Sequence, residues 1–218
     1  MGDSMKISAL LPAYNEEKTI ASVISVLKQS SKINEIVVID DGSIDNTFQK
    51  AKKCGARVIK LKKNQGKGAA LQKGISEISA DIILILDADL IGLKEIHIDS
   101  LLGPVIEQQV DMTVGTFSKG RVFTDLAQIV SPYLSGQRAV KRELIKDISN
   151  LKDTGYGAEV AINSYIKRNG RVKYVELANL THIMKEEKRG IMHGFRDRVK
   201  MYWDIIKTFF KDLLIYDF

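Results

Sequence analysis

Residues 81–90 read DIILILDADL, an apolar run that ends in two aspartates. The run at residues 81–86 is almost wholly apolar, which is typical of a strand buried on both faces, as in a parallel sheet covered by helices. Asp87 and Asp89 follow at once, two positions apart. The segment therefore predicts an inner strand whose carboxyl end carries a pair of carboxylates.

The chain before this strand alternates between short β-branched runs and segments in which apolar residues recur at helical spacing. We expect strands at residues 6–12, 35–40 and 56–61, and helices at residues 17–29, 45–53 and 67–78. This alternation predicts an α/β fold: a doubly wound, mostly parallel sheet flanked by helices and joined by right-handed crossovers.

The second half of the chain is less regular. We expect helices at residues 94–109 and 157–169, strands at 111–117 and 171–177, and a glycine- and serine-punctuated stretch with helical potential at 118–136. A length of 218 residues suits one domain with a small appendage. We expect the domain at residues 5–190, with its halves at 5–95 and 96–190, followed by an amphipathic helix at 191–218.

Composition narrows the function classes. The chain is 44% hydrophobic and 28% charged, which is ordinary for a globular protein with a sizeable core. Its net charge is +6, but the basic residues are dispersed without aromatic interleaving, so we expect no nucleic-acid partner. The single cysteine, Cys54, excludes an internal disulfide framework. No secretory signal is recognisable and no apolar run approaches the ~20 residues that span a bilayer, so we expect a cytoplasmic protein, with peripheral membrane contact as an open alternative.

Polar residues follow three of the expected strands. They are Tyr14–Asn15–Glu16, Asp40–Asp41 and Asp87–Ala88–Asp89. Ligands of doubly wound sheets bind beyond the carboxyl ends of the strands, so the three clusters are expected to converge on one edge. Hard divalent cations such as Mg²⁺ and Mn²⁺ bind carboxylate oxygens and often substrate phosphates, which suits Asp87 and Asp89. The alternative is that both aspartates only cap the following turn.

Four segments in order resemble the motif series of family 2 glycosyltransferases, which share the nucleotide-sugar-binding fold called GT-A. The segments are LLPAYNEEKTI (10–20), EIVVIDDGSIDNT (35–47), NQGKGAALQKG (64–74) and ILILDADL (83–90). The resemblance implies a nucleotide-sugar donor and a divalent metal, Mg²⁺ or Mn²⁺. Such a metal acts as a Lewis acid on the departing diphosphate.

The resemblance also implies roles for individual residues. The residues implied at the donor are Pro12, Ala13, Tyr14, Glu16, Asp40, Asp41, Gly66, Lys67, Asp87 and Ala88. Among them, Asp40 and Asp41 would place a carboxylate on the base edge, and Lys67 would approach the donor from the start of a helix. Asp89 would ligate the metal. Each has a plainer alternative: Tyr14 packing on the first helix, Asp40 forming a turn, or Lys67 solvated.

Two residues of the second half extend this interpretation. Glu159 is expected in the first turn of a helix, where a carboxylate in the cleft could act as general base for an acceptor hydroxyl. The alternative is an ordinary first-turn glutamate, stabilised by the helix dipole. His182, in a strand-like segment, is a candidate third metal ligand, or a partly buried polar residue. The residues expected to take part in catalysis are Glu159, Asp87 and Lys67.

A closer resemblance concerns the acceptor. The segments KGRVFTDL (119–126), LSGQRAV (134–140) and GYGAEVAI (155–162), with the later histidine, are similar to the layout of glucosyl-3-phosphoglycerate and mannosylglycerate synthases. This implies Gly120 and Arg121 at an anionic acceptor, Tyr156 and Glu159 beside the transferred sugar, and His182 on the metal. The expected reaction is transfer of a hexose from UDP-glucose to an acceptor such as phosphoglycerate.

Other functions stay open. The similar dolichyl-phosphate sugar synthases use a polyprenyl phosphate, and the expected helix at 191–218 carries apolar residues at helical spacing with lysines and arginines between them. Such a helix can lie on a membrane, pack on its own domain or join a homodimer. A non-catalytic nucleotide-binding module is a further alternative. A nucleotidyltransferase is disfavoured because PAYNEE stands where those enzymes carry a glycine-rich loop.

Overall fold

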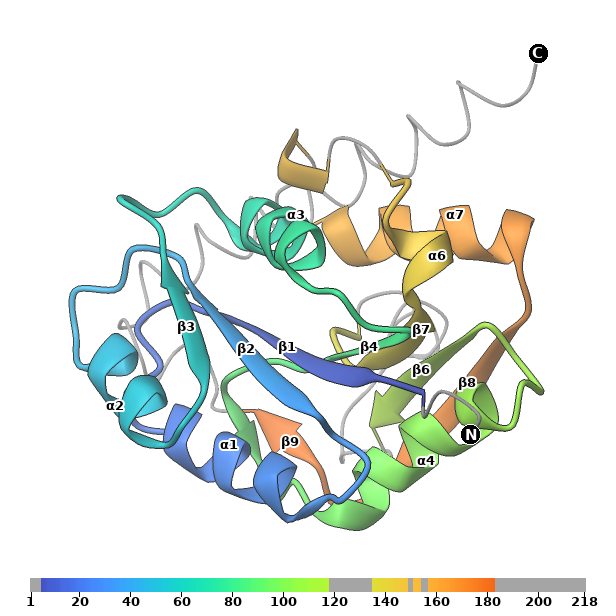
Figure 1. The fold of residues 1–218 in the computed structure, drawn as a ribbon, viewed down its shortest axis with the longest axis horizontal. Coiled ribbons are helices and arrows are strands. Elements are labelled where there is room, and N and C mark those ends of the chain that lie inside the picture. The colour runs from blue at the N-terminus through green and yellow to red at the C-terminus, as the bar shows by residue number, and fades with distance from the viewer. Residues whose placement is uncertain (1–4, 118–134, 149–150, 154–156, 183–218) are drawn as a thin grey trace, which may run out of the picture.

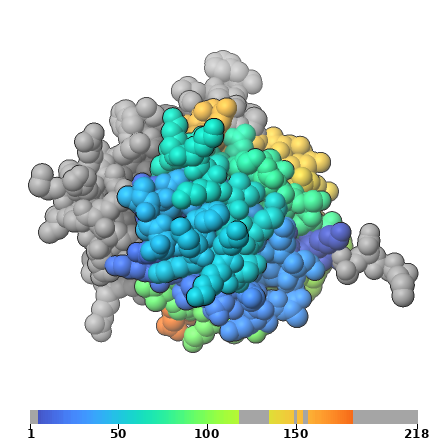
Figure 2. Space-filling model, turned by 60° about the vertical axis from the view of Figure 1, so that its left-hand side comes forward, coloured from blue at the N-terminus to red at the C-terminus, as the bar shows by residue number. Residues whose placement is uncertain are grey.

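The computed structural model describes residues 5–117, 135–148, 151–153 and 157–182. Helices cover both faces of a seven-stranded sheet (Figure 1), and residues of the first half of the chain, blue to green, form most of the coloured face in the space-filling view (Figure 2). The strands are β1 (Ile7–Ala13), β2 (Glu35–Asp40), β3 (Arg57–Lys60), β4 (Ile82–Ile85), β6 (Met112–Phe117), β7 (Arg138–Lys141) and β8 (Val172–Leu177). Their order in the sheet is β3-β2-β1-β4-β7-β6-β8.

Two helical layers enclose the sheet. The helices are α1 (Ile20–Gln29), α2 (Thr47–Lys53), α3 (Lys67–Glu77), α4 (Glu95–Ile106), α6 (Arg142–Ile145) and α7 (Ala158–Asn169), with a short 3-10 turn at Leu151–Asp153. Helices α1, α2 and α4 pack on one face, and α3, α6 and α7 on the other (Figure 1). Side chains of a strand alternate between its faces. Accordingly Leu10 joins the core beneath α3 and α7, whereas its neighbours Ala9 and Leu11 join the core beneath α1 and α4.

The doubly wound, mostly parallel sheet confirms the fold expected from the sequence. Strands β1, β2, β3 and β4 pair in parallel, and β6 pairs in parallel with β8. The helix expected at 191–218 and most of the stretch at 118–136 lie outside the described residues. None of the described helices has the length and apolarity needed to cross a bilayer.

Strand β7 was not expected from the sequence, and it decides the geometry of the site. It lies between β4 and β6 and is antiparallel to both, with Arg138 opposite Ile85 at the end of β4. Residues 135–137, which precede β7, therefore lie at the edge of the sheet where β1, β2 and β4 end. Helices α3 and α7 each precede a parallel strand, so both begin at this same edge.

A small ribbon was also not expected. Strands β5 (Leu90–Ile91) and β9 (Thr181–His182) pair antiparallel, with Leu90 opposite His182. The pairing brings the backbone of His182 next to the segment that follows Asp89.

Asp111 fastens the opposite edge of the sheet. Its carboxylate accepts hydrogen bonds from Nζ of Lys141 at 2.7 Å and from the backbone N of Arg171 at 2.8 Å, at the boundaries of β6, β7 and β8. Burial opposes ionisation of this carboxyl group, but the bonds from Lys141 and Arg171 outweigh it and hold the pKa of Asp111 well below its usual value.

We expect Asp111→Asn to lower the free energy of unfolding at pH 7 by about 1–3 kcal/mol, because hydrogen bonds to charged groups are lost. A pKa depressed in the folded state gives stability that is present above the unfolded pKa of about 4 and is lost as the pH falls below it. The difference between the parent and Asp111→Asn should therefore stay constant above about pH 5 in urea titrations, and should shrink steadily as the pH falls from about 5 through the low pKa of folded Asp111. The exposed Asp147→Asn is the control, and a difference independent of pH would contradict the prediction.

Candidate active site

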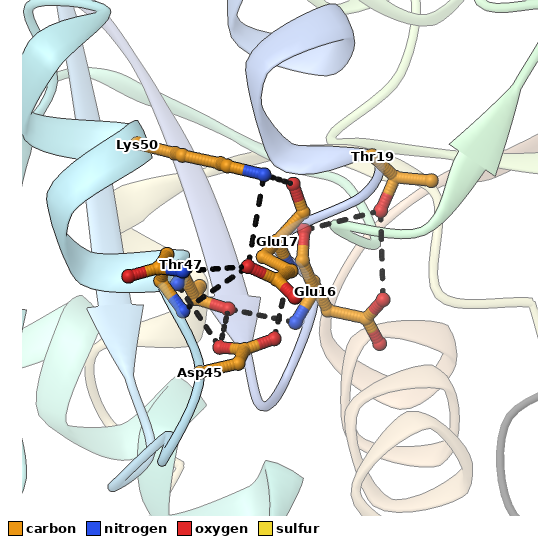
Figure 3. Close-up of polar contacts among 7 residues, drawn as sticks. Glu16, Glu17, Thr19, Asp45, Thr47 and Lys50 are labelled. Atoms are coloured by element: carbon orange, nitrogen blue, oxygen red, sulfur yellow. Dashed lines mark hydrogen bonds and ion pairs between the residues drawn. The ribbon is translucent and has the colours of Figure 1, made fainter.

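The loops after β1 and β2 are bonded to each other, as the expected convergence requires. The backbone N of Asn15 donates to Oγ of Ser43 at 2.9 Å, and that of Glu16 donates to Oγ1 of Thr47 at 2.7 Å. Figure 3 shows Glu16 and Thr47 among the polar contacts of these loops. Hydroxyl groups of the loop after β2 and of the first residue of α2 thus fix the backbone of the 14–16 segment, which was expected at the donor.

A second layer of contacts locks this junction. Lys50 of α2 donates to the carbonyl oxygen of Glu17 at 2.9 Å, and the backbone N of Glu17 donates to Oδ2 of Asp45 at 3.2 Å (Figure 3). Burial would raise the pKa of Asp45, but hydrogen bonds from Thr47 and Glu17 outweigh it and lower that pKa. The side chains of Asp45, Thr47 and Lys50 therefore stabilise the loop after β1.

Asp40 and Asp41 are both buried at the end of β2. The two oxygens of Asp41 accept the backbone N–H groups of Gln65 and Gly66, each at 2.8 Å, and so fix the turn that leads into α3. Burial raises the pKa of Asp41 in spite of these bonds. Oδ1 of Asp40 accepts the backbone N–H of Ser43 at 2.8 Å. Oδ2 of Asp40 is 3.7 Å from Nζ of Lys60 and accepts no hydrogen bond within the described part of the chain.

Lys67, the first residue of α3, bridges two carboxylates. Its Nζ is 2.5 Å from Oδ1 of Asp87, after β4, and 2.5 Å from Oε1 of Glu159, in the first turn of α7. The three side chains are 23%, 18% and 8% exposed, so the cluster is largely removed from water. Burial disfavours the ammonium charge, but the two carboxylates outweigh it and raise the pKa of Lys67. The three residues expected to be catalytic therefore form one cluster.

Gly136 and Gln137 complete this cluster, and neither residue was expected at the site from the sequence. Nε2 of Gln137 donates to Oδ2 of Asp87 at 3.0 Å, so each oxygen of Asp87 has a donor. A Cβ at Gly136 would lie 2.5 Å and 2.6 Å from the oxygens of Asp87 and 2.7 Å from Nζ of Lys67. The sequence signal for these two residues is the glycine beside a polar side chain in LSGQRAV. Their position next to Asp87, however, depends on the pairing of β7 with β4.

We expect Gly136→Ala to push Asp87 and Lys67 apart. A displacement of about 1 Å in a catalytic group can lower a rate by about 100-fold. The variant should lose activity by about 10- to 100-fold and remain folded, because the added atom meets side-chain ends. Gly103→Ala, in α4, is the matched control, since a Cβ there would meet no atom within 4 Å. Equal activity of both variants in a transfer assay would contradict this geometry.

The structure describes some of the remaining expected residues fully, one by its backbone alone, and others not at all. Pro12 and Ala13 end β1, Tyr14 and Glu16 are partly buried in the loop after it, and Ala88 is buried between Asp87 and Asp89. Gly120, Arg121 and Tyr156 lie outside the described residues. For His182 the structure describes the backbone position in β9 and no side chain.

The chemistry of this edge fits a hard divalent cation. Asp89 is partly buried, and the residue after it pairs with His182 across the β5–β9 ribbon. Within the described residues no group of three or more His, Cys, Asp or Glu side chains could hold a metal. The fit therefore depends on residue types: Asp89 brings a carboxylate, and His182, which is placed here by its backbone alone, is a histidine, and divalent metals accept both kinds of donor.

A doubly wound sheet with an antiparallel inserted strand and an acidic site at its strand ends defines the GT-A class of folds. The family described as "Glycosyl transferase family 2" matches residues 8–156. The chain belongs to this family, which confirms the resemblance seen in the sequence.

Two curated relatives show which enzymes the chain is similar to. It is 30% identical over 194 residues to a glucosyl-3-phosphoglycerate synthase of Mycobacterium tuberculosis (strain CDC 1551 / Oshkosh), covering 72% of this chain and 59% of the relative. It is 27% identical over 194 residues to an undecaprenyl-phosphate 4-deoxy-4-formamido-L-arabinose transferase of Serratia proteamaculans, covering 77% and 59%. The chain thus spans about three fifths of the length of these curated relatives.

The structural comparison extends over nearly the whole chain. A crystal structure of Mycobacterium tuberculosis glucosyl-3-phosphoglycerate synthase with Mn²⁺, UDP and glucosyl-3-phosphoglycerate superposes with a TM-score of 0.78 at 28% identity, covering 96% of this chain and 80% of that one.

Proposed function

We propose that this chain is a metal-dependent glycosyltransferase that moves a hexose from a nucleotide sugar, UDP-glucose, to an anionic acceptor such as phosphoglycerate. The observation that carries the proposal is Lys67 held between Asp87 and Glu159 at the carboxyl edge of the sheet. The family supports the reaction class. The mycobacterial enzyme of similar structure, whose crystals contain Mn²⁺, UDP and a glucosylated phosphoglycerate, supports the donor, acceptor and metal.

Asp40 supports recognition of a uracil base. Its Oδ2 is buried and accepts no hydrogen bond among the described residues. A buried acceptor without a donor is costly, so a ligand that supplies an N–H group there is favoured. Uracil has such a group at N3, whereas adenine presents an acceptor at its corresponding ring nitrogen. Asp41, by contrast, would act through the turn at Gln65 and Gly66 that positions Lys67.

Asp89 and His182 are the proposed primary metal ligands. Because Lys67 and Gln137 already contact the two oxygens of Asp87, that carboxylate would face the ribose or sugar and reach the metal secondarily. A bound divalent ion would act as a Lewis acid on the leaving diphosphate. The buried ammonium of Lys67 would add preorganised positive charge beside the same phosphates.

Glu159 is the proposed contact for the acceptor. It is buried and lies in the first turn of α7, where it can accept a hydrogen bond from an acceptor hydroxyl and serve as general base. Arg121 and Gly120 are proposed at the anionic group of the acceptor, since a guanidinium pairs well with carboxylate or phosphate. Tyr156 is proposed beside the transferred sugar.

A polyprenyl phosphate is the second candidate acceptor. The relative that acts in undecaprenyl-phosphate chemistry and the basic amphipathic pattern of residues 191–218 both favour it. The proposed location is cytoplasmic, with peripheral membrane contact and homodimerisation through 191–218 as accompanying proposals. The organised cluster around Lys67 disfavours a non-catalytic binding module.

A donor-by-acceptor screen tests this function. UDP-glucose and GDP-mannose would each be offered with phosphoglycerate, glycerate and a short-chain polyprenyl phosphate, with Mn²⁺ or with EDTA. We expect metal-dependent release of UDP and a glucosylated phosphoglycerate, with proton NMR giving its anomeric configuration. Product on the polyprenyl phosphate alone would move the assignment to the second acceptor. If none of the donor–acceptor pairs gave a product, the proposal would be contradicted.

A further inference from the structure

Arg138 is a buried cation that the proposed reaction does not use. It begins β7 in the interior of the sheet and is 1% exposed, among the largest of the fully buried side chains. Burying an ionised side chain is costly unless hydrogen bonds and opposite charges compensate it. Its presence next to the site therefore needs an explanation.

The hydrogen bonds of Arg138 join β7 to the helix that carries Glu159. NH1 donates to Oδ1 of Asn163 at 3.1 Å and to the carbonyl oxygen of Glu159 at 3.4 Å. NH2 donates to the carbonyl oxygen of Ser135. Asn163 and Glu159 are four residues apart and so lie on the same face of α7. The guanidinium thus fixes the first turn of α7 against the segment that carries Gly136.

The charge of Arg138 matters as well as its hydrogen bonds. None of the ion pairs among the described residues includes Arg138. No carboxylate oxygen of these residues therefore lies within 4 Å of its guanidinium nitrogens. Burial lowers the pKa of Arg138, and the negative charges of Glu159 and Asp87 oppose that shift. Arg138 and Lys67 carry two positive charges, and Asp87 and Glu159 carry two negative charges, so the buried group is neutral. If Lys67 turns toward a diphosphate, Arg138 is the cation that stays beside Glu159.

We propose that Arg138 is a positioning residue: its fork fixes the start of α7, and its buried charge holds the Glu159 carboxylate in place while Lys67 engages the donor. The proposal rests on the proposed function, because it assigns Arg138 a task in the same site. The residue acts through Glu159 and need not touch the substrate.

Steady-state kinetics of Arg138→Met and Arg138→Lys test the proposal. Loss of the fork and charge is expected to lower kcat by about 30- to 100-fold, as a misplaced catalytic group does. The KM for UDP-glucose should stay within about threefold, because the donor contacts lie elsewhere. Arg138→Lys retains the charge and should recover at least about tenfold of the lost kcat. Arg57→Met, at an exposed arginine paired with Glu35 and Glu77, is the matched control and should match the parent.

Two kinetic results would overturn the proposal. One is an unchanged kcat in folded Arg138→Met. The other is an Arg138→Lys variant that is as slow as Arg138→Met, since that would remove any role for the charge. Asn163→Ala provides a variant that keeps Arg138 and removes one of its anchors, and it should lower kcat in the same direction.

A thermal-unfolding cycle tests the linkage without substrate, so its outcome is separate from that of the transfer assay. Arg138→Met would be compared in the parent and in Glu159→Gln. Because part of the stabilisation by Arg138 is attraction to the Glu159 charge, the loss of Tm should be about 2–6 °C smaller in Glu159→Gln. Additive losses in the two backgrounds would refute the proposal even if the enzyme transfers glucose. A coupled cycle without any transfer activity would instead refute the proposed function alone.

Discussion

Lys67→Met is expected to slow transfer strongly and to destabilise the fold, because it leaves two largely buried carboxylates without their shared cation. Removing one partner of a buried ion pair costs about 3–5 kcal/mol, and the partial exposure of this cluster reduces the expected loss to about 2–4 kcal/mol. Loss of a preorganised charge at the reacting phosphates should lower kcat by about 10³-fold. Urea unfolding and an assay of UDP release measure the two effects.

Lys73→Met is the matched control for this variant. Lys73 lies on the same helix, has a half-exposed side chain, and pairs with Glu77 at the surface. Its replacement should change the free energy of unfolding by less than about 0.5 kcal/mol and leave transfer intact. If Lys67→Met were as stable and as active as Lys73→Met, the bridging role of Lys67 would be wrong.

The second large effect is expected for Asp89→Asn. An amide keeps the shape of the side chain but removes the negative charge that a hard divalent cation prefers. We expect transfer to fall by about 10³-fold, since Lewis-acid stabilisation of the leaving group is worth several kcal/mol. Stability without metal should change little, because Asp89 is only partly buried.

The control for Asp89→Asn is Asp99→Asn, at a surface acid paired with Lys32. Its activity should equal that of the parent at every Mn²⁺ concentration. An Asp89→Asn variant that keeps parental activity in saturating Mn²⁺ would be compatible with weaker metal binding alone. One that keeps parental activity at limiting Mn²⁺ as well would rule out Asp89 as a required ligand.

Strands β1, β2 and β4 could be predicted because they are buried on both faces. The run at residues 81–86 could hardly be anything other than an inner strand, and its observed bounds, Ile82–Ile85, differ by one residue at each end. Strand β7 could not be predicted in the same way. It has four residues, RAVK, with a charged residue at each end, and charged residues ordinarily argue against an inner strand.

The sequence predicted the individual residues of the site better than it predicted how they are arranged in space. Lys67, Asp87 and Glu159 come from three segments, and only the topology shows that one ammonium group bridges the two carboxylates. Gly136 and Arg138 were missed because their roles arise from contacts with residues about 20 to 70 positions away. For Asp41 the sequence could not separate a donor contact from the hydrogen bonds that hold the turn before α3.

Calorimetric titration of UDP-glucose into the protein, with and without Mn²⁺, tests the central claim that acids at this edge hold a cation which binds a diphosphate. We expect a binding isotherm in Mn²⁺ that disappears in EDTA and is at least about tenfold weaker in Asp89→Asn. Binding of equal affinity with and without the metal, unchanged in Asp89→Asn, would contradict the account.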